Sequence, residues 1–234
     1  MNEIKAITIA DNEEYLRQIS LPVDIQNDKN LQNDIAILDE FCKNSGVLAM
    51  AAVQLGIPKR IIYLKNTDLE IVQKMQTNSA TKEEENHNEA KILINPIIVY
   101  REGLTEYWEN CASCLNNCGR VLRPYKIELE YENIEGEKQN ITFKGFESTV
   151  LSHEYDHLNG ILHIDIAEEI KVMPKEERKI WRQTHDYNVI SKNGNYEELK
   201  NNLKTKTKKL LKDKGDRNEK INRKWNYKNI YRIF

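Results

Sequence analysis

The sequence predicts an α+β fold in which antiparallel β-sheets wrap around one central helix, followed by a helical and basic C-terminal extension. Residues 126–143 alternate apolar and polar side chains on both sides of a turn at 133–136, which is the pattern of a β-hairpin. Residues 146–158 instead carry apolar side chains at helical spacing and end at a stop signal, Asn159-Gly160. A surplus of basic residues after 198 predicts the extension.

The first hundred residues predict a series of shorter elements. Apolar side chains at 31, 35, 38, 41 and 42 recur at helical spacing and predict a packing helix over 31–43. The other expected elements are a short turn and an extended arm over 15–23, a stretch of small apolar residues at 47–58, a strand at 60–64, a polar surface insertion at 66–91, and a pair of strands over 92–100 broken by Asn95-Pro96. After the central helix we expect a short strand at 160–165 and helical patches over 167–186.

Composition restricts the class of protein. The net charge is −2, with 39% hydrophobic and 31% charged residues, so a globular protein without bulk affinity for nucleic acid or membranes is expected. There is no run of 18 apolar residues and no apolar segment of a signal peptide at the start, which predicts a cytoplasmic location. Three of the four cysteines lie within eight residues, which favours a metal or thiol site over a disulfide framework.

The central helix contains the motif His153-Glu154-x-x-His157. Side chains four residues apart lie on one helical face, about 5–6 Å apart at their Cβ atoms, so both imidazoles can bind one metal ion. Glu154 points elsewhere and can reach a water held by the metal, which is how metallohydrolases divide these roles. The alternative is an ordinary buried helix whose two histidines are hydrogen-bonded core residues.

A catalytic divalent metal needs a third protein ligand, and the sequence offers several. Proteases with this motif usually take it from downstream, where His163, Asp165 and Glu168 are available. A thiolate from upstream, Cys111, is the other possibility. Cys111, Cys114 and Cys118 could also form a separate structural zinc or iron–sulfur loop, but a fourth ligand at a suitable spacing is missing, since Cys42 is remote.

One amide, Gln54, lies within the small apolar stretch at 47–58. It could satisfy backbone groups of a buried loop, because buried polar groups usually pair. It could also donate a hydrogen bond to a polarised carbonyl.

Three segments together resemble the signatures of the peptide deformylase family. The family has Gly-x-Gly-Leu-Ala-Ala-x-Gln, Glu-Gly-Cys-x-Ser and Gln-His-Glu-x-Asp-His-x-x-Gly, in that order. The corresponding segments here are Val47-Leu48-Ala49-Met50-Ala51-Ala52-Val53-Gln54, Glu109-Asn110-Cys111-Ala112-Ser113 and Ser152-His153-Glu154-Tyr155-Asp156-His157-Leu158-Asn159-Gly160. The resemblance covers roughly residues 5–170.

The resemblance implies a role for each matching residue. Cys111, His153 and His157 would bind one divalent metal, with Fe(II) expected and Zn, Ni or Co as substitutes. Glu154 would act as general base and then as acid. Gln54 and the backbone N–H of Ala112 would stabilise the oxyanion. The substrate would be an N-formyl-methionyl peptide, cleaved to formate and a free N-terminus. Arg123 would brace Glu109, and Leu48, Phe146 and Val150 would line the methionine pocket.

Several positions depart from the family pattern. Val47 and Ala49 replace both glycines of the first signature, and Val47 would be strained if that position needs a positive φ. Asn110 replaces a glycine of the second signature, which is a mild change because Asn tolerates left-handed geometry. All three ligands, Glu154 and Gln54 are retained, so we expect an active enzyme.

We divide the chain into a catalytic domain over 1–170, a helical segment over 171–198 and a basic tail over 199–234. The tail holds thirteen Lys/Arg and three Asp/Glu, with aromatic residues towards its end. It is either a solvated, partly disordered extension or a contact for ribosomal RNA. Two other functions are open: a zincin-type metallopeptidase, which would leave Cys111 unexplained, and an RNA-binding accessory protein with a relic metal site.

Overall fold

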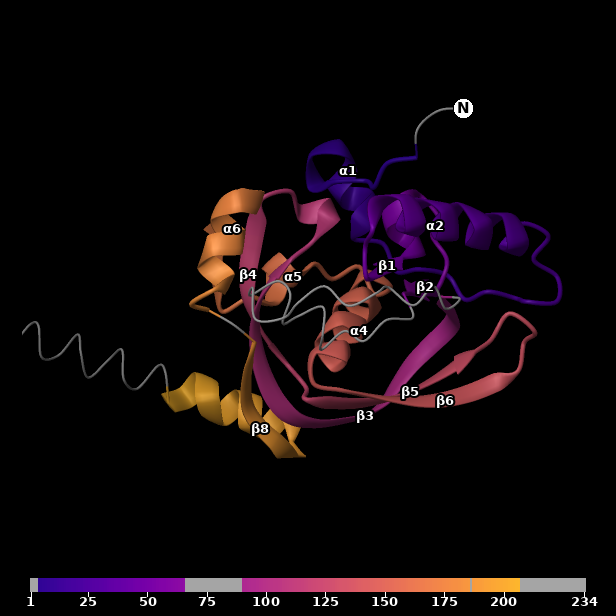
Figure 1. Cartoon of the computed structure of the whole chain (residues 1–234). Helices are drawn as coiled ribbons and strands as arrows, with labels where there is room; N and C mark the ends of the chain where they lie inside the picture. Colours follow the sequence, from indigo (N-terminus) through magenta and orange to yellow (C-terminus); the bar gives the residue numbers. More distant parts are fainter. Residues whose placement is uncertain (1–3, 66–89, 186, 207–234) are drawn as a thin grey trace, which may run out of the picture. The chain divides into compact units, whose positions relative to one another are not determined.

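The computed structural model describes residues 4–65, 90–185 and 187–206 (Figure 1). The chain divides into two compact units, Met1–Asn193 and Gly194–Phe234, which we describe separately. The first unit is a mixed α+β structure whose described strands form one eight-stranded sheet. In it, β1 pairs with β2, β2 with β3, β3 with β4 and β4 with β7, while β5 pairs with β3 and β6 and β8 pairs with β3. The registers of β1 to β7 are antiparallel.

The bounds of the elements are as follows. The strands are β1 (Ala49–Ala51), β2 (Ile61–Leu64), β3 (Lys91–Asn110), β4 (Asn117–Arg123), β5 (Lys126–Glu132), β6 (Lys138–Lys144), β7 (Glu169–Val172) and β8 (Asn188–Asn195). The helices are α1 (Ile9–Leu16), α2 (Leu31–Ser45), α4 (Phe146–His157), α5 (His163–Ile166) and α6 (Lys175–Arg182), with short 3-10 turns η1 (Ala52–Leu55) and η2 (Ala112–Cys114). The expected helix over 31–43, the strand at 60–64, the hairpin and the central helix are all confirmed as α2, β2, β5–β6 and α4.

The expected strand pair over 92–100 is wrong, because β3 is one curved strand of 20 residues (Figure 1). Asn95-Pro96 produces a register shift between Ile94 and Ile97 and does not end the strand. Asn95 has a φ of 50°, and its side chain forms hydrogen bonds of 2.8 and 2.9 Å with the backbone N–H and C=O of Val23. The side-chain amide thus ties the irregular point of β3 to the preceding arm, and the strand continues to Asn110.

Three other expectations need correction. The arm around 15–23 is preceded by the helix α1, which begins at a capping box formed by Thr8 and Asp11. Residues 160–165, expected as a strand, contain α5, where the Asp165 carboxylate accepts the Leu162 N–H at 2.8 Å. The segment 171–198, expected to be helical, contains α6 but also β8. The segments were too short for their periodicity to distinguish helix from strand.

The central helix α4 packs against β1, β4 and β6. Its Leu151 is fully buried in one apolar cluster with Ile62, Leu93 and Leu129 from the sheet. Burying a side chain of this size stabilises the fold by about 1.5–3 kcal/mol. Packing on several strands therefore fixes the orientation of α4, and with it the direction in which its histidines point.

Two regions singled out by the sequence lie partly or wholly outside the described residues. The structure describes neither 66–89, most of the expected surface insertion, nor 207–234, most of the basic tail. In the second unit, residues 196–206 form a helix that includes the first part of that tail. Within the described ranges, none of the helices has the length and apolar character needed to cross a membrane.

Candidate metal centre

The structure brings Cys111, His153 and His157 together. Cys111 follows the last residue of β3, and the two histidines lie one turn apart on α4. One donor atom from each residue lies within 4.8 Å of the others, and the Cys111 Sγ is 3.2 Å from the His157 Nε2. Bonds of about 2.0–2.3 Å to one tetrahedral ion place its ligands roughly 3.3–3.8 Å apart. A thiolate and two imidazoles therefore fit a single Fe, Zn, Ni or Co ion, and not Mg or Ca.

An ion pair behind the site orients His153. The Nδ1 of His153 lies 2.8 Å from Glu109 Oε2, so the Nδ1–H donates to the carboxylate and Nε2 is left for a metal. Glu109 also accepts hydrogen bonds from Arg123 at 2.8 and 3.0 Å, and Arg123 bonds to Asp156 of α4. The expected brace between Glu109 and Arg123 is confirmed, and it extends to the ligand helix at two points.

Burial and charge set the protonation of these groups. Burial would raise the pKa of Glu109, but Arg123 and His153 lower it well below its usual range. Burial likewise opposes ionisation of His153, but hydrogen bonds to Cys111 and Glu109 raise its pKa well above 6.5. Burial lowers the pKa of His157, which favours the neutral imidazole that metals bind.

Glu154 is next to His153 in the chain, but its carboxylate is hydrogen-bonded to β1. Its Oε2 accepts the backbone N–H of Ala51 at 2.8 Å, which ties the carboxylate to β1. Burial raises the pKa of Glu154 to about 7. A carboxyl with this pKa can take up and release a proton near neutral pH, as a general base and acid must.

Gln54, the last residue of the first signature, is hydrogen-bonded to the second signature. Its side-chain N–H₂ donates to Cys111 Sγ at 3.2 Å and to Ser113 Oγ at 3.1 Å, and its Oε1 accepts the Ala51 N–H at 3.2 Å. The sequence offered a structural and a functional interpretation of Gln54, and the geometry is compatible with both. The amide anchors the loop and places a donor next to the thiol.

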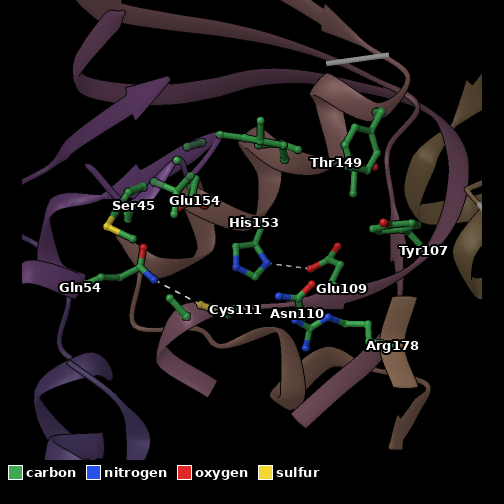
Figure 2. A pocket seen from close by; sticks show the side chains of 18 of the residues that line it. Ser45, Gln54, Tyr107, Glu109, Asn110, Cys111, Thr149, His153, Glu154 and Arg178 are labelled. Atoms are coloured by element: carbon green, nitrogen blue, oxygen red, sulfur yellow. Dashed lines mark hydrogen bonds and ion pairs between the residues drawn. The ribbon is translucent and has the colours of Figure 1, made fainter. Parts of the chain in front are cut away.

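A pocket of about 670 Å³, which is within the usual size of ligand sites, lies beside this group (Figure 2). Its polar lining includes Gln54, Glu109, Cys111, His153 and Glu154. One part of its lining is apolar and includes Leu48, Tyr107, Phe146 and Val150. The rings of Tyr107 and Phe146 meet edge to face at 5.2 Å. Ala112 also lines the pocket, at the start of η2.

The downstream candidates for the third ligand do not join the triad. Asp165 forms an ion pair with Arg17 at 2.8 Å, and the Nε2 of His163 lies 3.1 Å from the backbone carbonyl of Asn117. Cys114 is buried in the same apolar cluster as Cys111, and Cys118 is buried in another, but neither thiol belongs to the group of donors that could hold a metal. Among the residues that the structure describes, Cys111, His153 and His157 are the one group placed to hold a metal.

The departures from the signatures introduce no backbone strain. The non-glycine residues with a positive φ in the described part of the chain are Asn95 and Leu115, so Val47, Ala49 and Asn110 adopt ordinary conformations. Sequence reasoning missed three basic residues of α6 that line the pocket, Lys175, Arg178 and Arg182. Arg182 donates to the Asn110 side chain at 2.6 Å. Their spacing of three and four residues, which places them on one helical face, was the available signal.

A buried Cys/His₂ donor set beside a carboxyl, an amide and a pocket is typical of a metal-dependent hydrolase. Comparison with known proteins gives the family. Residues 4–173 match the family model for polypeptide deformylase. A peptide deformylase of Pelagibacter ubique is 31% identical over 169 residues, which cover 72% of this chain and 88% of the relative.

Solved structures agree with this result. A peptide deformylase of Synechococcus elongatus in complex with actinonin has a TM-score of 0.59 and 27% identity, covering 72% of this chain and 83% of that one. A probable peptide deformylase of Synechococcus phage S-SSM7 has a TM-score of 0.54 and 30% identity, covering 70% and 99%. The chain belongs to the polypeptide deformylase family.

Proposed function

We propose that this protein removes the N-formyl group from the N-terminal methionine of newly made peptides and releases formate. The observation that supports the proposal is the convergence of three side chains that could hold a metal, together with Glu154 and Gln54, beside one pocket with an apolar wall. Formamide hydrolysis needs a nucleophile at neutral pH, a group that moves protons, and donors for the developing oxyanion. Each requirement has a residue of this chain beside the pocket.

Each residue of the site has its own role in the reaction. Cys111, His153 and His157 would hold the metal, which when bound polarises the formyl carbonyl and lowers the pKa of water to about 7. Glu154 takes the proton from the attacking water and delivers it to the leaving amine. Gln54 exchanges its present bond to Cys111 or Ser113 for one to the formyl oxygen, and the Ala112 N–H supplies a second donor.

The apolar wall supplies the methionine pocket. Phe146 is packed edge to face against both Tyr107 and Tyr187, at 5.2 and 5.6 Å. Leu48 and Val150 complete an apolar surface next to the ligand helix. A flexible, polarisable methionine side chain fits a surface of this kind.

Further parts of the proposal rest on the sequence. The resident metal is Fe(II), with Zn, Ni or Co as substitutes, because a mixed thiolate and imidazole set suits these ions. Residues 1–170 form the catalytic domain, in which antiparallel sheets wrap around α4, and the match over 4–173 supports this boundary. The protein acts in the cytoplasm, and the basic tail 199–234 contacts ribosomal RNA.

The experiment is an assay of formate release from formyl-Met-Ala-Ser by anaerobically purified, Fe(II)-loaded protein. Wild type should release formate, and Glu154→Ala should lower the rate by at least about a hundredfold, which is the usual contribution of a general base. Glu147→Gln, on the same helix but outside the pocket, is the control and should keep the activity. Cleavage of internal peptide bonds without formate release would instead support the metallopeptidase.

A further inference from the structure

The helix α6 places a row of cations along one wall of the pocket. Lys175, Arg178 and Arg182 follow one another at spacings of three and four residues, so they lie on one helical face. All three line the pocket, whereas the acidic residues of the same helix, Glu176 and Glu177, do not. We call these three residues the cationic stripe. The family match ends at residue 173, so the stripe is supplied by a part of the chain beyond the matched region.

The stripe is held at the pocket by aromatic packing. Trp181, on α6, meets Trp108 of β3 edge to face at 5.6 Å, and Met173 and Cys118 are buried in the same cluster. The ammonium of Lys171 lies 3.9 Å from the centre of the Trp181 ring. These contacts fix α6 against the end of β3 that leads into Cys111.

The members of the stripe differ in what they bind. Arg182 donates to the Trp108 carbonyl at 3.1 Å and to the Asn110 side chain at 2.6 Å, and its guanidinium lies 5.0 Å from the centre of the Tyr107 ring. Arg182 is therefore a positioning residue that holds the residue before Cys111.

Within the described part of the chain, the side chain of Arg178 makes two long contacts, to the Met173 carbonyl at 3.5 Å and to Cys118 Sγ at 4.0 Å. Among the described residues, no carboxylate lies within ion-pair distance of Arg178 or Lys175. Figure 2 shows Arg178 next to Asn110, on the side of the pocket away from Ser45 and Gln54. Two positive charges thus border the pocket without a negative partner from the described chain.

We propose that Lys175 and Arg178 determine specificity, by favouring formyl-methionyl peptides that carry an acidic side chain shortly after the methionine. The inference rests on the proposed deformylase function and concerns the part of the peptide beyond the formyl group and the methionine. An extended peptide advances about 3.3–3.6 Å per residue, so a side chain one or two residues beyond the methionine lies within reach of a long cationic side chain. A guanidinium binds a carboxylate with two parallel hydrogen bonds, and a basic peptide side chain at the same place is repelled.

The test compares three C-terminally amidated peptides, formyl-Met-Ala-Asp, formyl-Met-Ala-Ser and formyl-Met-Ala-Lys, so that only the side chain carries charge. At low salt, Fe(II)-loaded wild type should show a kcat/KM about fivefold higher for the Asp than for the Lys peptide, mainly through KM, because the charge is remote from the reacting bond. The ratio of kcat/KM for the Asp peptide to that for the Lys peptide (the Asp/Lys ratio) should fall at high salt. A peptide ending in a free carboxylate separates terminal from side-chain recognition.

Arg178→Gln and Lys175→Gln should each lower the Asp/Lys ratio towards one, while Lys179→Gln, which changes an exposed charge of α6 outside the pocket, should leave it unchanged. Equal kcat/KM values for the Asp and Lys peptides with wild type, or an equal effect of Lys179→Gln, would overturn the proposal.

A binding measurement separates this proposal from the deformylase function itself. The three peptides are titrated calorimetrically into metal-loaded Glu154→Gln protein, which reports charge preference without turnover. Absence of formate from the Ser peptide with wild type overturns the proposed function. Equal Kd values for the Asp and Lys peptides overturn the role of Lys175 and Arg178, and a Kd about fivefold lower for the Asp peptide supports it.

Discussion

Replacing Glu109 by Gln should destabilise the protein and weaken its metal site together. The carboxylate is 4% exposed and accepts two hydrogen bonds from Arg123, which is 5% exposed, and one from His153. Gln keeps the shape of the side chain but removes its charge. Arg123 is then left with Asp156 as its charged partner, and His153 loses the carboxylate that orients its ring.

The expected loss of stability follows from the burial of Glu109 and Arg123. Removing one partner of a buried ion pair costs about 3–5 kcal/mol, because an uncompensated charge stays in the interior. The amide oxygen of Gln can still accept one hydrogen bond and Asp156 remains, so we expect the lower limit, about 3 kcal/mol. Loss of a carboxylate behind a metal-bound histidine typically costs about 10–100-fold in metal affinity, and the same range is expected here.

Glu106→Gln is the matched control. Glu106 also lies on β3 and pairs with an arginine of β4, Arg120, but the two side chains are 23% and 29% exposed. A pair this open to solvent contributes about 0–1 kcal/mol, and no metal ligand contacts it in the described structure. The free energy of unfolding of the metal-free proteins is measured by urea titration at pH 7, and metal affinity by competition with a chelator.

The pH dependence gives a second check on Glu109. Its pKa in the folded protein is held well below the ordinary value of 4.5, so the stabilisation is complete at neutral pH and is lost as the pH falls below about 4.5. The difference between wild type and Glu109→Gln should therefore shrink as the pH falls below about 4.5. It should also shrink as the pH rises above 6.5, because Glu109 contributes to the raised pKa of His153 and this part of the stabilisation is lost as His153 deprotonates. Equal losses of stability for Glu109→Gln and Glu106→Gln would refute the argument from burial.

Three further predictions concern the site and the backbone near it. Cys111→Ser should abolish tight metal binding and lower formate release by at least about tenfold, because a neutral hydroxyl is a poor substitute for a thiolate; full metal content and full activity would contradict the ligand assignment. In metal-free protein, Glu154→Gln should be more stable than wild type at pH 8 but not at pH 4.5. The reason is that burial raises the pKa of Glu154 in the folded protein from 4.5 to about 7, so wild type loses stability as the pH rises from 4.5 to 8. Urea titrations in which the stabilities of the two proteins do not cross over this pH range would contradict this. Gly160→Ala should lower the free energy of unfolding by at least about 2 kcal/mol more than Gly46→Ala. Both glycines have φ near +70°, but the new Cβ at 160 would clash with the Arg17 carbonyl oxygen, whereas nothing lies within 4 Å at 46; equal urea midpoints would show that the loop moves aside freely.

Local patterns determined much of the fold. The helical spacing of Leu31, Leu38 and Cys42 specifies α2, and the alternation around Ile127 and Leu129 specifies the hairpin, since each pattern repeats often enough to define its period. The metal motif is likewise local, because two histidines four residues apart share a face on any helix.

Where local sequence signals conflicted, tertiary contacts determined which secondary structure formed. Asn95-Pro96 predicts a break, yet β3 continues because Asn95 bonds to Val23, 72 residues away in sequence. Asp165 caps α5 and also pairs with Arg17, so a segment that alternates like a strand becomes a helix. Such partners lie too far apart in sequence for any periodicity to reveal them.

The sequence by itself determined the motif-bearing helix and, through the ordered signatures, the candidates Gln54, Cys111 and Glu154. Only the tertiary structure decided that a thiol 42 residues before His153 lies within 4.8 Å of both imidazole donors, that Glu109 orients His153, and that Arg178 borders the same pocket. The physical reason is that side-chain periodicity is set within one element, whereas convergence at a site depends on strand register and on how helices pack against the sheet.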